Sequence, residues 1–428
     1  MPKYPHFPQG IAAPFPDAPD TAQEADGSLA PEPYLHRPQT ALKGRGAVTN
    51  LRGRYDAVAR EAFDDDWHPV AFDRTSPGAI DPGAPEDDAP PPLNTIITEE
   101  HARSILSRNR SPDLPFSLSL NPYRGCEHGC IYCFARPSHS YLGLSPGLDF
   151  ESRLVAKVNA PALLARELAR PGHVPDTITI GINTDAYQPC ERQYRLTRQL
   201  LQILHDCHHP VAMITKSSLI ERDIDLLAPM AARGQAIAAV TLTTLDPVIA
   251  RSLEPRAAAP SRRLRVIRTL AEAGIPVSVS IAPVIPFVTE PDLERVMEAA
   301  VDAGARHAGY ILLRLPWEVA PLFRQWLHAH FPDRAARVMH RIQDMRGGKD
   351  YDAAFGTRMR GTGIWADLLQ QRFEKASRRL GIAHRHLAYG GMERTPFKRE
   401  VAQALARELA AQEKTAADQG TGGQMPLF

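Results

Sequence analysis

The stretch CEHGCIYC, residues 126–133, holds three of the five cysteines of this 428-residue chain. Cysteines this close together are poorly placed for a disulfide framework and suit a metal or cluster site in a reducing compartment. A structural zinc wants a fourth ligand, which here would be His128 or a distant cysteine. Three cysteines spaced C-x3-C-x2-C are also suited to hold a [4Fe-4S] cluster by three irons, leaving its fourth iron open to an exchangeable ligand.

Predicted strands and helices alternate around this stretch. One strand is expected just before the cysteines, and five more follow, at 116–120, 177–182, 211–215, 236–243, 277–282 and 307–313. Most are apolar runs without alternation, as in parallel strands that are covered on both faces. Helices between them are expected to stop at Gly234, Gly274 and Gly304. We therefore expect an α/β fold, a partial (β/α)6 TIM-like barrel or an open doubly wound sheet, with its chemistry at the carboxyl ends of the strands.

Composition divides the chain into four parts. Residues 1–95 are predicted to be a Pro-rich, acidic and largely extended N-terminal extension, since residues 1–100 contain 16 prolines and carry a net charge of −9. Residues 96–332 form the partial barrel. Residues 333–412 are a basic helical C-terminal region, with a charge of +7 over 333–400. Residues 413–428 are predicted to be a flexible tail, and this tail ends in the peptide QMPLF.

One piece of the N-terminal extension differs from the rest. Residues 43–55, KGRGAVTNLRGRY, are compact, basic and rich in glycine. Two interpretations are open: a solvated loop, or a folded arm that clasps the main domain or its substrate.

Overall charge and hydropathy exclude several classes of protein. The formal net charge is +1, so no field of the whole molecule gathers polyanions. No run of 18 apolar residues exists, and the first ten residues contain three prolines where a secretory signal needs an apolar helix. We expect a soluble, cytoplasmic protein that does not enter a membrane.

The cysteine spacing, its place after the first strand and the aromatic Phe134 that follows resemble the radical S-adenosylmethionine (SAM) superfamily. The resemblance is closest to the spore photoproduct lyase-like branch, also called DNA repair photolyases, and covers roughly residues 121–316. It implies two cofactors, a [4Fe-4S] cluster and S-adenosyl-L-methionine. It also implies the metal ligands, which are Cys126, Cys130 and Cys133.

The same resemblance assigns cofactor-binding residues along the strands. Tyr132 packs near the cofactor, and the motif for its methionine amino group falls on Asn183, Thr184 and Asp185. The ITKS sequence after the third strand places a lysine at the methionine carboxylate, and a hydroxyl residue and an arginine follow; these are Lys216, Thr243 and Arg263. The backbone that flanks adenine is provided by Ala282, Pro283 and Val284.

A catalytic cysteine is where this chain departs from the lyase. That enzyme carries a cysteine near the end of its second strand that returns a hydrogen atom to the substrate radical, and GINTDAY has none. Cys190 lies a few residues further on and is the candidate for this role, although a buried structural thiol is the alternative. The stretch HDCHHP, 205–210, looks like a metal patch or, equally, like a polar helix C-terminus.

Two further features point to DNA. The sequence RGGKDYDAAFGTRMRGTGIW, 346–365, mixes arginine with glycine and aromatic rings, so contacts to DNA are expected from Arg346, Lys349, Arg358 and Arg360. The final QMPLF resembles the sliding-clamp-binding motif of bacterial repair proteins, with anchors at Gln424, Leu427 and Phe428. A reductant such as flavodoxin or ferredoxin is also expected.

The leading hypothesis is therefore a lyase-like radical SAM enzyme that generates a 5′-deoxyadenosyl radical and acts on DNA, in repair or base modification. A radical SAM enzyme acting on RNA, a peptide or a small molecule is the second reading. A non-catalytic zinc-binding protein is the third.

Overall fold

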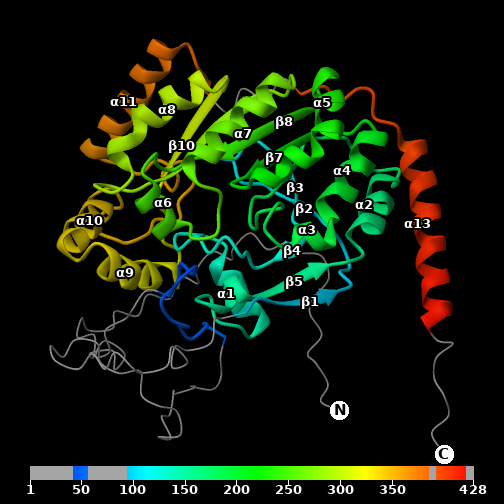
Figure 1. The fold of residues 1–428 in the computed structure, drawn as a ribbon, viewed down its shortest axis with the longest axis horizontal. Helices are drawn as coiled ribbons and strands as arrows, with labels where there is room; N and C mark the ends of the chain where they lie inside the picture. The colour runs from blue at the N-terminus through cyan, green and yellow to red at the C-terminus, as the bar shows by residue number, and fades with distance from the viewer. Residues whose placement is uncertain (1–41, 56–93, 385–391, 421–428) are drawn as a thin grey trace, which may run out of the picture.

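Six parallel strands run side by side in chain order through the centre of the molecule (Figure 1). The computed structural model describes residues 42–55, 94–384 and 392–420. The strands are β3 (Leu118–Leu120), β6 (Ile178–Ile180), β7 (Val211–Thr215), β8 (Ala236–Thr241), β9 (Val277–Val284) and β10 (His307–Leu312). These coincide with the six predicted strands, so the partial TIM-like barrel is confirmed.

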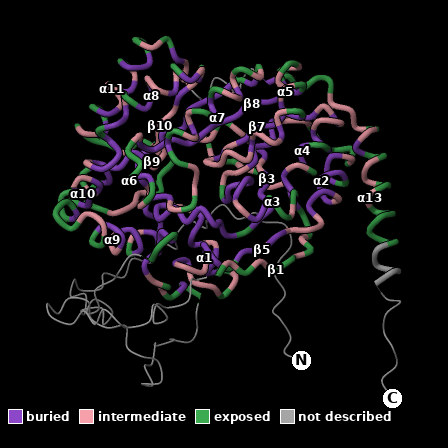
Figure 2. Tube along the Cα trace, viewed as in Figure 1, coloured by how far each residue is buried: buried purple, intermediate pink, exposed green. Residues whose placement is uncertain are grey.

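A helix covers the outer face at each crossover. In chain order these helices are α2 (Ala160–Leu168), α4 (Leu196–Asp206), α5 (Ile224–Ala232), α7 (Pro260–Glu272), α8 (Leu293–Asp302) and α11 (Ile364–Leu380). Gly234, Gly274 and Gly304 have positive φ just beyond α5, α7 and α8, as predicted. Large aliphatic residues on the strands pack against these helices in one core, which Figure 2 shows as the buried centre of the trace.

The opposite face of the strands, directed into the barrel, is small and polar. Residues alternate between the two faces along a strand, and the positions between the large aliphatic ones include Thr179, Ala239, Ser278 and Ser280. All four are buried. The interior of the barrel therefore presents mainly small side chains and hydroxyl groups, with the larger Ile237 at its amino-terminal end.

The barrel is incomplete, and a loop from the C-terminal region bridges its open side. The outermost strands of the sheet are β2 (Leu106–Arg108), antiparallel to β3, and β11 (Ala383–His384), parallel to β10. Arg358 donates two hydrogen bonds of 2.6 Å to the carboxylate of Asp113 in the β2–β3 loop. Leu312 N donates to Met359 O. We call this junction between the first and last strands the seam.

A second, smaller sheet lies below the barrel in Figure 1 and carries the segment that leads into the cysteines. Its strands are β1 (Ile96–Glu100), β5 (Arg153–Lys157) and β4 (Tyr123–Arg124). The sequence did not predict it, because these strands have only two to five residues each. Short helices complete the fold: η2 (Arg136–Leu142), α1 (Asp149–Ser152), α3 (Glu191–Tyr194), η3 (Ser218–Asp223), α6 (Pro247–Leu253) and η4 (Glu290–Asp292).

The C-terminal region is helical, as predicted, and packs on the barrel. It contains α10 (Pro332–Asp344), which follows α9 (Val319–His330), then α11 and α13 (Arg399–Gly420). Helix α13 lies beside α2 and continues to Gly420, so the prediction of a flexible tether from residue 413 is wrong for 413–420. Alanine and long polar side chains such as Glu413 and Lys414 are good helix formers, so α13, once begun, extends through them and ends at Gly420. The QMPLF peptide and most of the predicted N-terminal extension, residues 1–41 and 56–93, lie outside the described residues.

Residues 392–398 close the amino-terminal end of the barrel. Met392 is buried against Ala212 and Ile237, two residues on the inner face of the strands. Glu393 N donates to Gly234 O and Lys398 N to Cys207 O. We call residues 392–398 the plug.

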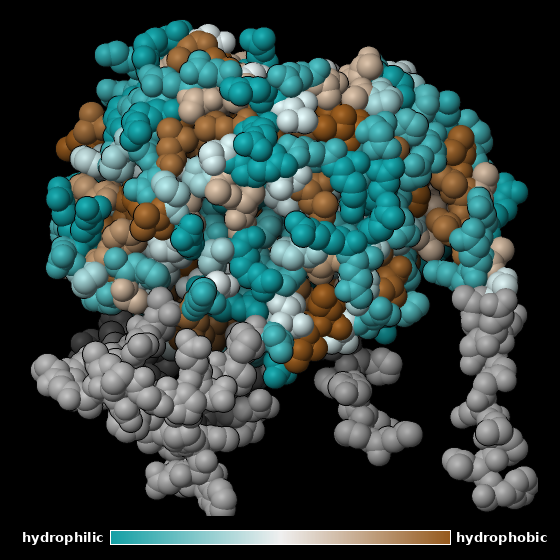
Figure 3. Space-filling model, viewed as in Figure 1, coloured by the Kyte–Doolittle hydropathy of each residue, from teal (hydrophilic) through white to brown (hydrophobic). Residues whose placement is uncertain are grey.

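In the part of the chain that the structure describes, no helix is long and apolar enough to cross a membrane. The face seen in Figure 3 is largely hydrophilic, with scattered apolar residues.

Candidate functional site

The three cysteines lie in one loop, 125–135, between β4 and η2. Cys126 and Cys130 are buried, and Cys133 is half-buried. Burial raises the pKa of Cys126, and the nearby charges of Asp185 and Cys130 raise it further. Burial also raises the pKa of Cys130, to about 12, while the Lys216 ammonium opposes the rise. Without metal these are therefore neutral thiols, and a bound cation would be needed to hold them as thiolates.

Arg136 fixes the shape of this cysteine loop. Its side chain is fully buried, and each of its five N–H donors has an acceptor. Two acceptors are the carbonyls of Gly129 and Cys130, inside the loop. The others are the carbonyls of Pro146 and Gly147 and the carboxylate of Glu151. A guanidinium is the one side chain with enough donors to bind all five.

The basic segment at residues 42–55, here called the arm, packs against the cysteine loop. Gly46 N donates to Glu151 Oε2 at 2.9 Å and Ala47 N donates to Oε1 at 2.8 Å. Arg45 is buried and donates to the backbone carbonyl of Glu151. Arg54 forms an ion pair with Glu318, at the start of α9. The arm therefore clasps the main domain, and the solvated-loop interpretation is wrong.

A buried charge cluster follows the next strands. Lys216 comes directly after β7, and Arg263, in α7, donates to Thr241 O at the end of β8. Arg263 is 1% exposed and forms an ion pair with Glu254, to which Tyr132 also donates. Burial alone would lower the pKa of Lys216, but Cys130, Glu254 and Asp185 raise it overall. The structure thus places Tyr132, Lys216 and Arg263, three of the predicted cofactor-binding residues, together and next to Cys130.

Asp185 anchors the loop after β6 to the end of β7. It accepts hydrogen bonds of 2.7 Å from Thr215 Oγ1 and from Lys216 N. Its carboxylate also lies 3.3 Å from His128 Nδ1, within the cysteine loop. Burial would raise the pKa of Asp185, yet His128 and Lys216 lower it to about 2. Asp185 is therefore an ionised tie between the cysteine loop and β7.

The remaining predicted cofactor residues fall at the same edge of the sheet with differing contacts. Thr243 is buried just beyond β8, and its hydroxyl has no partner among the described atoms. Ala282, Pro283 and Val284 form the carboxyl end of β9. Thr184 donates to Tyr123 O and Asn183 N to Asn121 Oδ1, so these contacts tie the β6 loop to the segment after β3. The backbone carbonyl of Asn183 lies 3.9 Å from Cys133 Sγ.

Cys190 sits apart from this arrangement. It packs with Tyr123, Leu154, Ala156 and Leu196, between the small sheet and α4. Burial raises its pKa well above the ordinary value. This apolar packing supports the structural role for Cys190 rather than hydrogen donation.

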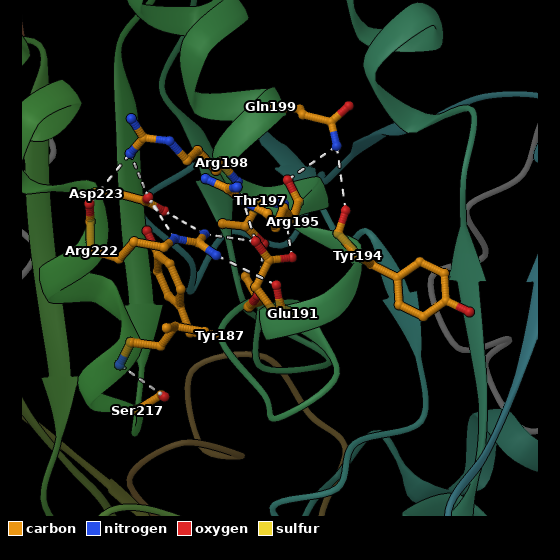
Figure 4. A network of polar contacts seen from close by, with 12 residues as sticks. Tyr187, Glu191, Tyr194, Arg195, Thr197, Arg198, Gln199, Ser217, Arg222 and Asp223 are labelled. Carbon is orange, nitrogen blue, oxygen red and sulfur yellow. Dashed lines mark hydrogen bonds and ion pairs between the residues drawn. The ribbon is translucent and has the colours of Figure 1, made fainter.

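A polar network stabilises the turn that carries Cys190 (Figure 4). Glu191 is fully buried and accepts from Thr197 N and from Arg222. Arg222 and Arg198 both pair with Asp223. The network joins α3 and α4 to η3 and thereby holds the loops after β6 and β7 in register.

The histidines near Cys207 are not arranged as a metal patch. His209 Nδ1 lies 3.1 Å from Pro210 O, and its Nε2 lies 3.0 Å from His173 Nε2. His205 instead contacts Asp206. The contacts of His209 leave its Nε2 as the acceptor for the His173 N–H, so the two rings satisfy each other.

Two of the four residues expected to contact DNA have structural partners instead. Arg346 is buried and donates to Leu313 O and Thr357 O. Arg358 forms the seam with Asp113. Lys349 and Arg360 are exposed. The sequence could not separate these four residues, because glycine and arginine are common both in buried loop contacts and in phosphate sites.

Sequence reasoning missed three charged residues at the site: Arg136, Glu151 and Glu254. Each is buried and acts on the cysteine loop or on its neighbours. The sequence offered only a weak indication for Glu254, which is an isolated carboxylate nine residues before the predicted site residue Arg263. Arg136 and Glu151 had none, because four of the five acceptors of Arg136 are backbone carbonyls, and Glu151 accepts from backbone N–H groups of the arm, which lies far away in sequence.

The comparison with protein families decides the class. The model of the Radical SAM superfamily matches residues 120–300, which include the cysteine loop, Lys216 and Arg263. Residues 120–300 are a radical SAM domain. An uncharacterized protein of Mycobacterium tuberculosis strain H37Rv is 36% identical over 226 residues, and the match spans 52% of this chain and 66% of that protein. An uncharacterized protein of Methanocaldococcus jannaschii is 29% identical over 39% of this chain and 60% of its own length.

Solved structures similar to this chain include spore photoproduct lyase. One such structure has a TM-score of 0.47 and 14% identity, and the match covers 66% of this chain and 79% of that one. A radical S-adenosylmethionine methyltransferase from Kitasatospora setae has a TM-score of 0.33 and 18% identity, covering 50% and 41%. At these values the likenesses leave the branch within the superfamily open.

The cysteine loop of the radical SAM domain fits the cluster that the superfamily implies. Within the described ranges, no group of three or more His, Cys, Asp and Glu side chains could hold a single metal ion. A four-iron cube makes a different demand, because each thiolate binds its own iron at a separate corner. Three thiols in one loop, of which Cys133 is half-buried, can meet this demand.

Proposed function

We propose that this chain is an iron-sulfur enzyme that reductively cleaves S-adenosylmethionine and acts on DNA. One observation carries the proposal. Three cysteines in a single loop lie next to Lys216 and the Glu254–Arg263 pair, at the carboxyl edge of a parallel barrel. Active sites of such barrels lie at this edge.

Each part of the site has a role in this proposal. Cys126, Cys130 and Cys133 would hold three irons, and Lys216 would bind the cofactor carboxylate. The bound cluster and cofactor supply a 5′-deoxyadenosyl radical that abstracts hydrogen from the substrate. Glu254 keeps Arg263 and Tyr132 in place, and the buried loop around Cys130 excludes water.

Anaerobic reconstitution tests the cofactor part of the proposal. The reconstituted protein should be brown, with about four irons and four sulfides per chain, and should form 5′-deoxyadenosine when dithionite and S-adenosylmethionine are added. Cys130→Ala should lose the cluster, while Cys207→Ala, which removes a buried thiol outside the loop, should keep it. A colourless protein with one zinc would support the zinc-binding reading instead.

DNA as substrate rests on sequence resemblance and on surface charge. The order of the motifs around Tyr132, Lys216 and Arg263 resembles the lyase-like branch, and Lys349 and Arg360 are exposed on the basic region. Incubating the reduced enzyme with ultraviolet-damaged and undamaged oligonucleotides, followed by product analysis, tests it. Turnover of S-adenosylmethionine that no oligonucleotide alters would refute a DNA substrate.

A substrate other than DNA is the second candidate. The engagement of Arg346 and Arg358 in structural contacts favours it, since these residues supplied half of the expected DNA contacts. The barrel interior, lined mainly by small and hydroxyl side chains, would accept part of an RNA, a peptide or a small molecule.

Two partners are proposed as well. A flavodoxin or ferredoxin would supply the electron for cleavage of S-adenosylmethionine.

The QMPLF peptide would bind a bacterial sliding clamp through Gln424, Leu427 and Phe428. A synthetic peptide of the last ten residues should bind a clamp with about micromolar affinity, because two buried apolar side chains at about 1.5–3 kcal/mol each plus hydrogen bonds reach that range. Replacing Leu427 and Phe428 with Ala should abolish binding in a fluorescence titration.

A further inference from the structure

The arm is joined to the cysteine loop through one carboxylate, Glu151. Its two oxygens accept from different backbone N–H groups, Gly46 N to Oε2 and Ala47 N to Oε1. Arg136 also donates to Oε1. Both oxygens must therefore be acceptors, which a carboxylate allows and an amide does not. Glu151 is fully buried, and its charge is balanced by Arg136.

Backbone contacts between the arm and the cysteine loop are equally restrictive. A Cβ added to Gly46 would lie 1.8 Å from Gly129 O, a carbonyl of the cysteine loop. A Cβ added to Gly129 would lie 2.7 Å from Glu151 Oε2, and Gly129 has φ +65°. Gly129 O is in turn held by Arg136. The arm, Glu151, Arg136 and Gly129 therefore meet with no space for an added methyl group.

We infer that residues 45–47 of the arm are part of the cluster site, and that Glu151 and Arg136 are positioning residues that transmit the arm's contact to Cys130. The arm fixes Glu151, Glu151 and the loop carbonyls fix Arg136, and Arg136 fixes the backbone of Gly129 and Cys130. The inference rests on the proposed function in one respect, which is that the three cysteines are cluster ligands. A segment about 80 residues before the first cysteine thus completes the site.

Thiol reactivity in the full-length protein without iron tests the inference independently of the cluster and of any substrate. In the unaltered protein, iodoacetamide should modify Cys133 first and Cys126, Cys130 and Cys207 slowly, because those three are buried. In Gly46→Ala, Cys126 and Cys130 should react at least about tenfold faster, while Cys207 stays protected. Gly172→Ala is the matched control, since Gly172 is exposed and has no atom within 4 Å of its added Cβ.

The result that overturns the inference is unchanged protection of Cys126 and Cys130 in Gly46→Ala. If Cys207 is exposed as well, that variant has unfolded, and Glu151→Gln decides by the same assay. Exposure of Cys207 in both variants also overturns the inference, because the arm would then belong to the general core rather than to the cysteine loop.

Reconstituted protein gives a second readout that a merely structural role would not move. Glu151→Gln leaves the Arg136 charge uncompensated beside the cysteine loop, and a buried positive charge stabilises a reduced cluster. The midpoint potential should therefore shift to a more positive value, and an unchanged potential in a variant that keeps its iron speaks against the inference. If the unaltered protein binds no cluster, the proposed function fails, while the thiol result still stands or falls by itself.

Discussion

Lys216 shows how single residues at the site acquire their charge state. Its ammonium lies 6.0 Å from the centre of the Tyr132 ring, and Cys130, Glu254 and Asp185 raise its pKa. The lysine is therefore charged at every physiological pH and available to bind an anionic group.

Lys216→Ala should leave the cluster in place and weaken S-adenosylmethionine binding by about 1.5–3 kcal/mol, the size of a charge-assisted hydrogen bond. Titration of the cofactor, followed by the electron paramagnetic resonance signal of the cluster, measures the change. Lys349→Ala, at an exposed lysine of the basic region, is the control and should bind the cofactor normally. Equal affinities in the two variants would show that Lys216 does not contact the cofactor.

The His173–His209 pair predicts a pH dependence of stability. Burial lowers the pKa of His209 to about 3 and that of His173 to about 4, from 6.5. Below pH 6.5 the unfolded chain binds protons that the folded chain does not, so stability is complete above that pH and falls as the pH drops toward 4. At pH 5, the lowered pKa of His209 alone should reduce the free energy of unfolding by about 2 kcal/mol. Urea unfolding at pH 7 and 5 measures it, and His209→Gln should reduce the difference.

At the scale of elements, the plug is the segment with the clearest test. Met392 fills the amino-terminal end of the barrel, where it packs against Ala212 and Ile237. Met392→Ala should lower the free energy of unfolding by about 2–5 kcal/mol, the range for emptying a buried methionine site. Phe355→Ala, which truncates an exposed side chain, is the comparison and should lower the free energy of unfolding much less. Equal losses would mean that the plug does not pack in solution as described.

Elements also show what a sequence can and cannot predict. The six parallel strands were predictable because each is an apolar run bounded by turn residues, and the helix stops at Gly234 and Gly274 because those positions need positive φ. The strand Arg153–Lys157 escaped prediction, since it has only five residues and its partners β1 and β4 are themselves short. Cys126 and Lys216 were recognisable as candidate site residues because each belongs to a short sequence motif. Arg136 was not, because its five acceptors are assembled only by the folded chain.

The seam between Asp113 and Arg358 belongs to the scale of the whole molecule. The two side chains are 10% and 14% exposed, and they join the β2–β3 loop to the C-terminal region. Arg358→Ala should lower stability by about 1.5–3 kcal/mol, because the Asp113 carboxylate loses a charged hydrogen-bond partner. Thermal unfolding measures this loss.

Arg360→Ala is the matched comparison, since Arg360 is exposed two residues away. It should leave stability within about 0.5 kcal/mol and, if DNA is the substrate, reduce the salt dependence of DNA binding. Loss of stability in Arg360→Ala with none in Arg358→Ala would contradict the arrangement of the seam.

The seam also has a consequence for how the protein is made. A ribosome releases all six barrel strands before Arg358 emerges, so the growing chain holds a barrel that is still open along one side. Closure brings together residues 245 positions apart, and contacts at such separation form late. Until then, strand edges and apolar surface of the nascent barrel remain accessible to other chains. Aggregation therefore competes with maturation in the interval between synthesis of the last strand and arrival of the segment that closes it.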